Sequence, residues 1–189
     1  TQSLDTEVER QVYQLARQLF GDALEETSEL APLAAGMKDT LLNLQRAEAF
    51  DVHAERMQNA PQLFEQEVRE RLELSREVRG WQYVRARACQ QQYKAALAHI
   101  FERYDFLVSP SVPVTATEVD AREVRLGEQI IDVRAALLSH TCAWNLAGLP
   151  ALSLPAGQVR GMPVGLQVIG AAGGDDYLLQ VMSRLYRRD

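Results

Sequence analysis

Two short apolar runs, separated by a glycine-containing loop, constrain the fold of this chain more than any other feature. The runs are Ala151–Ala156 and Val164–Ile169, and the loop between them holds Gly157 and Gly161. Neither run alternates polar with apolar residues, which is typical of strands buried on both faces. The sequence therefore predicts two buried strands, either separate or as a hairpin inside a larger sheet, that helices must cover.

Length and charge limit the classes of protein that this chain can belong to. Its 189 residues are enough for one compact core and too few for two comfortable domains, so a single domain over residues 1–189 is predicted. We expect residues 1–104 to be mostly helical and residues 105–189 to contain strands and helices. The net charge of -6 argues against direct binding to nucleic acid or to an anionic membrane.

Cysteine usage and the absence of targeting signals point to the cytoplasm. Cys89 and Cys142 are far apart in the sequence, and we expect two buried, reduced thiols, with a disulfide as the alternative. No apolar run reaches the length of a membrane span, and residue 1 opens no signal peptide. A cytoplasmic location without membrane contact is therefore expected.

The first helix is predicted over Asp5–Phe20. Asp5 or Thr6 can cap its start, and Gly21 ends it. The next segment, Ala23–Leu30, is a weak strand prediction because its β propensity is poor. The apolar stripe expected on the helix consists of Val8, Val12, Leu15, Ala16 and Leu19.

Three further helices are predicted in the first half, with Pro61 at the start of the second of them. They are Leu33 to about Arg56 with an interruption near Gly36, then Gln62–Leu74, then Trp81–Tyr104. The residues expected on apolar faces are Leu41, Leu44, Ala47 and Val52 in the first of these helices, and Cys89, Tyr93, Leu97 and Ile100 or Phe101 in the last.

The second half mixes strands and helices, so the fold class is α/β in the sense of mixed α+β. Phe106–Val108 is a short buried strand, residues 114–130 form a surface loop, and Asp132–Ala147 is one helix that ends at Gly148. A last helix is predicted over Tyr177–Arg187, with Leu178, Leu179, Met182 and Leu185 facing inward.

No catalytic motif emerges from the residues alone. The three histidines, His53, His99 and His140, show no metal-ligand spacing, and there is no GxGxxG, Walker or GxSxG motif. Ser109, Ser111, Ser139 and Ser153 lack an obvious base nearby in sequence. The residues by themselves predict an α+β domain with no metal site and no cofactor.

Four runs in order resemble the C-terminal portion of the amidase signature family. They are YDFLVSPSVP at Tyr104–Pro113, NLAGLPALSLPAG at Asn145–Gly157, GMPVGLQVIG at Gly161–Gly170, and GDDYLLQVMSRL after them. The run AEAFDVHAERM at Ala47–Met57, and the RARACQQQYKAAL helix with Tyr83 before it, are also similar to helices of that family.

The resemblance implies a fold and a reaction. The fold would be an incomplete amidase-signature-like mixed sheet covered by helices. The family hydrolyses carboxylic amides with a serine, a second serine joined by a cis peptide bond, and a lysine. These lie in a Gly/Ser-rich segment N-terminal to the matched part, and this chain has no Gly-Gly-Ser-Ser run. We therefore expect a fragment that supplies sheet core and one wall of the substrate pocket and is inactive alone.

The same resemblance implies the partners. They would be the missing N-terminal catalytic part of the parent enzyme and a small amide substrate, with no cofactor. A cut sheet also exposes strand edges, through which a homo-oligomer could form. The residues that match the family pattern in structural roles are Asp105, Pro110, Gly148, Pro150, Pro155, Gly157, Pro163 and Gly165.

The candidate pocket residues are Leu138, Thr141, Cys142 and Asn145, which would share one face of the predicted helix. In the A subunits of glutamine-dependent tRNA amidotransferases, which belong to this family, an acid usually stands seven residues before the Asn and helps to hold the glutamine amino group. Here that position is Leu138, which is equally open to a role in core packing, while Asn145 is predicted to tie the turn by side-chain hydrogen bonds.

A fifth candidate, Arg71, matches an arginine run of those A subunits only in part. The hydrophobic residue at 138 favours an amidase with an apolar pocket. The alternatives are the A subunit of a glutamyl-tRNA(Gln) amidotransferase and a non-catalytic interaction module.

Overall fold

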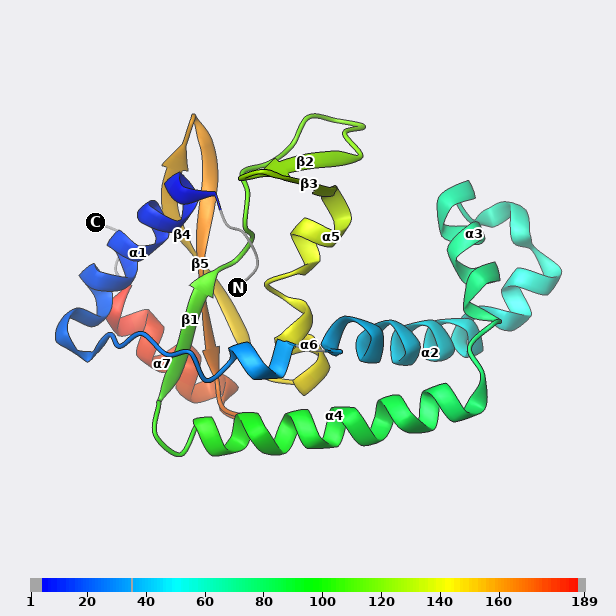
Figure 1. The fold of residues 1–189 in the computed structure, drawn as a ribbon, viewed down its shortest axis with the longest axis horizontal. Coiled ribbons are helices and arrows are strands. Elements are labelled where there is room, and N and C mark those ends of the chain that lie inside the picture. The colour runs from blue at the N-terminus through cyan, green and yellow to red at the C-terminus, as the bar shows by residue number, and fades with distance from the viewer. Residues whose placement is uncertain (1–4, 35, 187–189) are drawn as a thin grey trace. The chain divides into compact units, whose positions relative to one another are not determined.

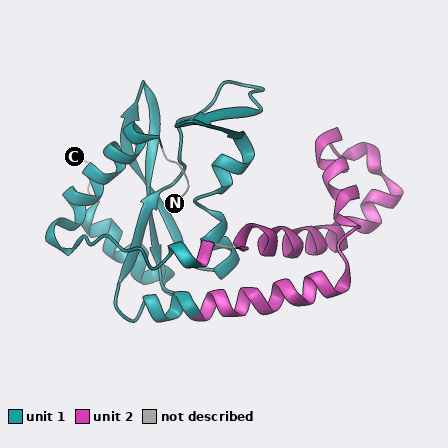
Figure 2. Cartoon of the chain, in the orientation of Figure 1, with its two compact units in different colours: residues 1–32, 96–189 teal, residues 33–95 magenta. Residues whose placement is uncertain are grey.

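A computed structural model describes residues 5–34 and 36–186 of the chain. These residues fall into two compact units (Figure 2), which we call unit 1 (Thr1–Pro32 with Ala96–Asp189) and unit 2 (Leu33–Ala95). Unit 1 contains antiparallel strands and helices, and unit 2 is helical, so the predicted mixed α/β class is confirmed. The assignment of residues 1–189 to a single domain stays a prediction.

A three-stranded antiparallel sheet forms the centre of unit 1 (Figure 1). Its strands are β1 (Phe106–Pro110), β4 (Ala151–Val159) and β5 (Met162–Gly170), in the order β1-β5-β4. β5 is flanked on both sides, and its Val168 and Ile169 are fully buried. The two runs that constrain the fold therefore pair as a hairpin, as the sequence allowed.

The turn of this hairpin and the bulge beside it use left-handed backbone. Arg160 and Gly161 both have positive φ, 50° and 76°, as a two-residue type I′ turn requires. Gly157 was predicted in the same turn, but it lies at a bulge within β4, with φ of 97°. A Cβ on Gly157 would lie 2.7 Å from the Gln11 side-chain nitrogen, which donates to the Ala156 carbonyl.

Two helices bury one face of the sheet. The helix α1 (Thr6–Phe20) is capped by Asp5 and followed by Gly21, both as predicted. The helix α7 (Asp175–Leu185) contributes Leu178 and Met182. The buried core that the three elements share consists of Val8, Val12, Ala16, Leu154, Ala156, Val159, Val164, Leu166, Val168, Leu178 and Met182. We call it the α1/α7 core.

The inward orientation predicted for the other two leucines of α7 is wrong. Leu179 and Leu185 are 55% and 43% exposed. Leu179 follows Leu178 directly, so it points about 100° away from the stripe that the buried Leu178 and Met182 form. Leu185 continues that stripe, but it is the last residue of α7, where the helix ends.

Three local predictions in unit 1 are wrong. Residues 114–130 were expected to be a loop, but this segment contains the strand β2 (Glu123–Leu126) and the start of β3 (Gln129–Asp132). The two strands pair as an antiparallel hairpin. Asp132–Ala147 was expected to be one helix, but α5 (Val133–Leu138) and α6 (Cys142–Ala147) are separate. Ala23–Leu30 was expected to be a strand, but it follows a short 3-10 turn, Gly21–Ala23, and pairs with no strand of the described chain.

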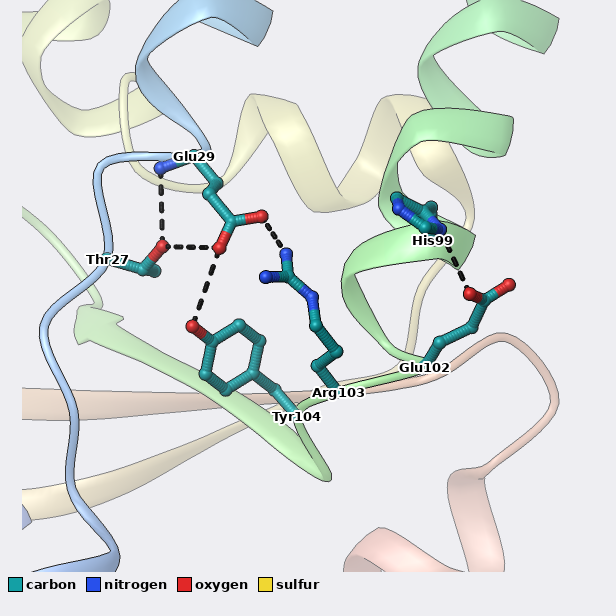
Figure 3. Close-up of polar contacts among 6 residues, drawn as sticks. All are labelled: Thr27, Glu29, His99, Glu102, Arg103 and Tyr104. Atoms are coloured by element: carbon teal, nitrogen blue, oxygen red, sulfur yellow. Dashed lines mark hydrogen bonds and ion pairs between the residues drawn. The ribbon is translucent and has the colours of Figure 1, made fainter.

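Side chains hold this last segment in place instead of strand pairing (Figure 3). Glu29 forms an ion pair with Arg103 and accepts hydrogen bonds from the hydroxyls of Thr27 and Tyr104, at 3.3 and 3.5 Å. The hydrogen bond from Arg103 is the main reason that the pKa of Glu29 lies below its ordinary value. A 3-10 turn, Ala31–Ala34, follows.

Unit 2 is built from α2 (Met37–Asn59), a 3-10 turn (Pro61–Leu63), α3 (Gln66–Ser75) and the larger part of α4 (Gly80–Ile100). The α2 helix starts after Gly36, which has a φ of 73°. Its contacts are polar and aromatic: the Tyr83 hydroxyl donates to Glu48 at 3.2 Å, Arg76 lies over the Phe50 ring, and His53 meets Phe64 edge-on.

Two burial predictions on these helices are wrong. Val52 on α2 is 75% exposed, although Leu44 of the same predicted face is buried. Cys89 on α4 is exposed, whereas Cys142 in unit 1 is buried as expected. None of the helices in the described part of the chain is long and apolar enough to cross a membrane.

The cap of α1 makes a prediction about acid stability. The Asp5 carboxylate accepts from the backbone N–H of Glu7 at 2.9 Å and pairs with the Arg160 guanidinium. Burial raises the pKa of Asp5, but the hydrogen bonds from Arg160, Glu7 and Val8 together bring that pKa below its ordinary 3.8. A carboxyl with a lowered folded pKa contributes stability above its unfolded pKa, and this contribution is lost as the pH falls through the folded value.

We therefore expect Asp5→Asn, which retains the cap but not the charge, to flatten the fall in the free energy of unfolding between about pH 5 and pH 2. Urea titrations across this range measure the effect. Asp22→Asn, at an exposed position on the Gly21–Ala23 turn, is the control and should leave the slope unchanged. An Asp5→Asn variant with the wild-type acid slope would contradict the assignment.

Candidate functional site

A polar row crosses the face of the sheet opposite the α1/α7 core. Val164, Leu166 and Val168 of β5 face that core, so the alternating residues Gly165, Gln167 and Ile169 point to the other face. Ser109 of β1 and Ser153 of β4 are the register partners of Gln167 on its two sides. Three polar side chains thus lie in line across three strands.

Gln167 is the buried centre of this row. Its side chain is 6% exposed, in a strand whose other members are almost all apolar. Its Nε2 donates to the Ser109 hydroxyl at 3.3 Å and to the backbone carbonyl of His140 at 3.0 Å. The second bond joins the central strand to the connection between α5 and α6.

A pair of serines lies next to it, above Gly165. The hydroxyls of Ser111 and Ser153 are 2.6 Å apart, and the Ser111 N–H donates to the Gly165 carbonyl at 2.9 Å. A Cβ on Gly165 would lie 2.7 and 2.8 Å from the two hydroxyl oxygens, so the pair depends on glycine there. A serine hydroxyl is too weak a base to activate the other one, so this pair alone does not form a nucleophile.

The four candidate pocket residues of unit 1 lie around the α5–α6 connection. Leu138 ends α5 and is 37% exposed, while Thr141 precedes α6 and its N–H and hydroxyl both donate to the Leu138 carbonyl, at 3.1 and 3.3 Å. Cys142 is buried and Asn145 is exposed. The helix break leaves Leu138 in α5 and Cys142 and Asn145 in α6, so the one continuous helix on which all four were predicted to share a face does not form.

Backbone bonds close the turn after α6. Gly148, with φ of 69°, donates to the Asn145 carbonyl, and Leu149 donates to the Trp144 carbonyl. The turn that was expected to depend on the Asn145 side chain is therefore held by main-chain groups.

Two buried nitrogen atoms lie in or next to the α5–α6 connection. Among the described residues, Nε2 of His140 and Nε1 of Trp144 are buried without a hydrogen-bond partner. Burial lowers the pKa of His140, which favours the neutral imidazole near neutral pH.

Arg71, the fifth candidate, lies on α3 in unit 2. Its guanidinium pairs with Glu67 one turn earlier at 3.1 Å, and both side chains are about half exposed. The other four candidates belong to unit 1, whereas Arg71 belongs to unit 2.

The residues assigned to structural roles lie mainly along the sheet. Asp105 directly precedes β1 and Pro110 ends it. The Pro150 carbonyl accepts from Gly170 at the start of the hairpin. In the β4–β5 hairpin, Pro155 lies opposite Gly165, and Pro163 lies opposite Gln158.

Sequence reasoning missed Gln167, the Ser111–Ser153 pair and the burial of the His140 ring nitrogen. A signal existed for Gln167, because a lone amide in an otherwise apolar buried strand must find a hydrogen-bond partner. No local signal predicted that residues 42 positions apart would form the serine pair. Within residues 5–34 and 36–186, no group of three or more His, Cys, Asp or Glu side chains is placed to hold a metal ion.

The family model "Amidase" matches residues 4–179, which is nearly the whole chain. The chain belongs to the amidase family. A crystal structure of an amidase superposes on 97% of this chain with a TM-score of 0.84 and 30% identity.

Curated relatives match the chain over shorter stretches. The A subunit of a glutamyl-tRNA(Gln) amidotransferase from Symbiobacterium thermophilum is 45% identical over 83 residues, which are 43% of this chain and 16% of the relative. A fatty acid amide hydrolase from Oryza sativa subsp. indica is 38% identical over 86 residues, which are 45% of this chain and 14% of the relative. The chain also spans only 43% of the crystallised amidase.

Proposed function

We propose that this chain forms part of an enzyme that hydrolyses carboxylic amides, a carbon–nitrogen bond hydrolase. The observation that carries the proposal is the family match over residues 4–179, together with the likeness of almost the whole chain to an amidase crystal structure. The likeness covers the sheet and both units, so it is more than a shared hairpin.

The described residues indicate which catalytic groups this chain contains and which it lacks. Amide cleavage by a serine needs a base that takes its proton, and the Ser111 and Ser153 hydroxyls are bonded only to each other in the described structure. We infer that the nucleophile and its base belong to a catalytic part outside these 189 residues. The chain would supply the sheet core and one wall of the pocket, would be inactive alone, would need no cofactor, and would act in the cytoplasm.

The proposed pocket wall is the α5–α6 connection with Leu138, Thr141, Cys142 and Asn145. The exposed face of Leu138 is an apolar surface on a connection whose backbone is well bonded, which suits the acyl part of an apolar amide. Arg71 stays a proposed pocket residue, although its ion pair with Glu67 gives it a role within α3.

The amidotransferase is the second candidate function. It is favoured by the 45% identity with an amidotransferase A subunit over 83 residues. It is disfavoured by Leu138, because an apolar side chain does not hold the ammonium group of glutamine. The small amide substrate and the catalytic part are the proposed partners of an amidase, whereas an amidotransferase would reach charged tRNA only through a complex.

Self-association through strand edges is also part of the proposal. β1 and β4 lie at the two edges of the sheet. The Tyr186 hydroxyl donates a hydrogen bond to the Pro155 carbonyl, and the Gln11 amide donates one to the Ala156 carbonyl. These two carbonyls of β4 are therefore not available to pair with the strand of another chain.

The substitution Leu138→Asp tests the proposed pocket. In the gene product that contains this chain, we expect kcat/KM for hexanamide to fall at least about tenfold, because a carboxylate replaces an apolar contact. Hydrolysis of glutamine should rise relative to hexanamide, since the new carboxylate can pair with an ammonium group. Ammonia release over a range of amide concentrations measures both.

Leu137→Asp is the matched control, because Leu137 precedes Leu138 on the same helix and is equally exposed, at 37%. It should leave kcat/KM within about twofold, since adjacent residues point to different sides of a helix. Equal losses in the two variants would remove Leu138 from the pocket. Preferential hydrolysis of glutamine by the unaltered protein would favour the amidotransferase.

A further inference from the structure

We propose that Gln167 is a positioning residue that sets the α5–α6 connection, and through it Leu138 and Thr141. The inference rests on the proposed function, because it assigns a cause to the geometry of the proposed pocket wall. Gln167 does not itself need to touch the substrate. It acts through one backbone carbonyl, that of His140.

The break between α5 and α6 leaves the His140 carbonyl free to accept a hydrogen bond from Gln167. The first bond of α6 runs from the Asn145 N–H to the Thr141 carbonyl, at 3.1 Å, so the carbonyl of His140 stands one residue outside the helical ladder. In one continuous helix that carbonyl would accept from the residue four positions later. Gln167 instead donates to it across the sheet face, which compensates for the interruption of the helix.

The donor is held rigidly. Gln167 lies on the central strand, with Ser109 and Ser153 paired to its two sides, and its side chain is 6% exposed. Its second bond, to the Ser109 hydroxyl, restrains the same amide group from β1. A buried amide in such a site has few alternative partners, so its bond to His140 fixes one arrangement of the connection.

The connection transmits this position to the pocket residues. Leu138 lies two residues before His140 and Thr141 one residue after it. The two bonds from Thr141 to the Leu138 carbonyl close a tight turn around His140. Moving His140 therefore moves both pocket residues, which changes the surface that binds the substrate.

The test is Gln167→Met in the gene product that contains this chain. Methionine has a similar length and no N–H donor, and it adapts well to buried sites. We expect KM for hexanamide to rise about tenfold while kcat stays within about twofold, because the wall is displaced but no reacting group is lost. Hydrogen exchange of the backbone over residues 139–142 should become faster. KM does not depend on the fraction of protein that is folded, so a destabilised sample remains informative.

Val168→Ala is the matched control. Val168 is the next residue of the same strand, fully buried, and faces the α1/α7 core. It should lower the melting temperature through the cavity it leaves but should change neither KM nor the relative exchange of residues 139–142. A rise in KM in both variants would reduce Gln167 to a general role in stability.

Two further variants separate the bonds of the amide. Ser109→Ala removes one restraint on the amide and keeps its bond to His140, so KM should rise less than it does in Gln167→Met. Gln167→Asn keeps the amide but shortens the side chain by one methylene, and should raise KM in the same direction as methionine. Wild-type KM and wild-type exchange in Gln167→Met or Gln167→Asn would overturn the inference.

The two proposals fail separately. If the unaltered protein releases no ammonia from any amide, the proposed function is wrong, while hydrogen exchange of residues 139–142 still tests whether Gln167 holds the connection. If the unaltered protein hydrolyses amides and the variants match it in KM and exchange, only the role of Gln167 is wrong.

Discussion

Replacing Leu166 by alanine is expected to lower the free energy of unfolding of unit 1 by about 3 kcal/mol. Leu166 is 1% exposed and stands in the middle of β5, where its side chain is part of the α1/α7 core. Its removal leaves a cavity between a central strand and its helices, which cannot collapse without shifting the sheet. This is a large fraction of the stability of an ordinary domain.

Urea unfolding, monitored by tryptophan fluorescence, measures the loss in the free energy of unfolding of unit 1. The chain has two tryptophans, and Trp144 is buried in unit 1 while Trp81 lies in unit 2 and is 55% exposed. A Trp81→Phe background therefore reports on unit 1 alone. Leu179→Ala on α7 removes the same atoms from a side chain that is 55% exposed and should cost less than about 0.5 kcal/mol. Equal costs at the two positions would contradict the assignment of the core.

The second large effect concerns activity. The 189-residue chain by itself is expected to hydrolyse no amide above the uncatalysed rate, a loss of about a millionfold or more relative to a complete enzyme. The physical reason is that its paired serines, Ser111 and Ser153, share a hydrogen bond with each other and have no activating base beside them in the described structure.

Ammonia release from hexanamide at high protein concentration measures this loss. The variants Ser111→Ala and Ser153→Ala provide the control for contaminating activity, because trace turnover by an impurity is the same in all three preparations. Turnover by the chain that either substitution abolishes would show that the chain carries its own nucleophile.

The elements that the sequence predicted well are those specified by local chemistry. Asp5 and Gly21 bound α1 because a capping carboxylate and a glycine with positive φ act within a few residues. The strands β4 and β5 were predicted because their two apolar runs suit buried strands, and their pairing as a hairpin was one of the two arrangements that the sequence left open.

The elements that could not be predicted depend on distant partners. The break between α5 and α6 is compensated by Gln167, a strand residue that lies 27 positions beyond the His140 carbonyl it binds. The segment after α1 is held by Glu29 and Arg103, 74 positions apart, and not by its own β propensity. The β2–β3 hairpin is short and mostly exposed, so it lacks the apolar pattern that identifies strands.

The candidate site was predicted in part for the same reason. The resemblance to a family indicated Leu138, Thr141, Cys142 and Asn145, which lie in and between α5 and α6 of unit 1, and their role in a pocket stays a prediction. It did not indicate the polar row on the sheet face, because Ser109, Gln167 and Ser153 come from three strands that only the fold aligns.

Ammonia release from hexanamide by the complete gene product that contains these residues is the most direct test of the central claim. We expect turnover that depends on amide concentration and is lost when only the 189-residue chain is supplied. A complete product that folds but releases no ammonia from hexanamide, from an aromatic amide or from glutamine would contradict the assignment of this chain to an amide-hydrolysing enzyme.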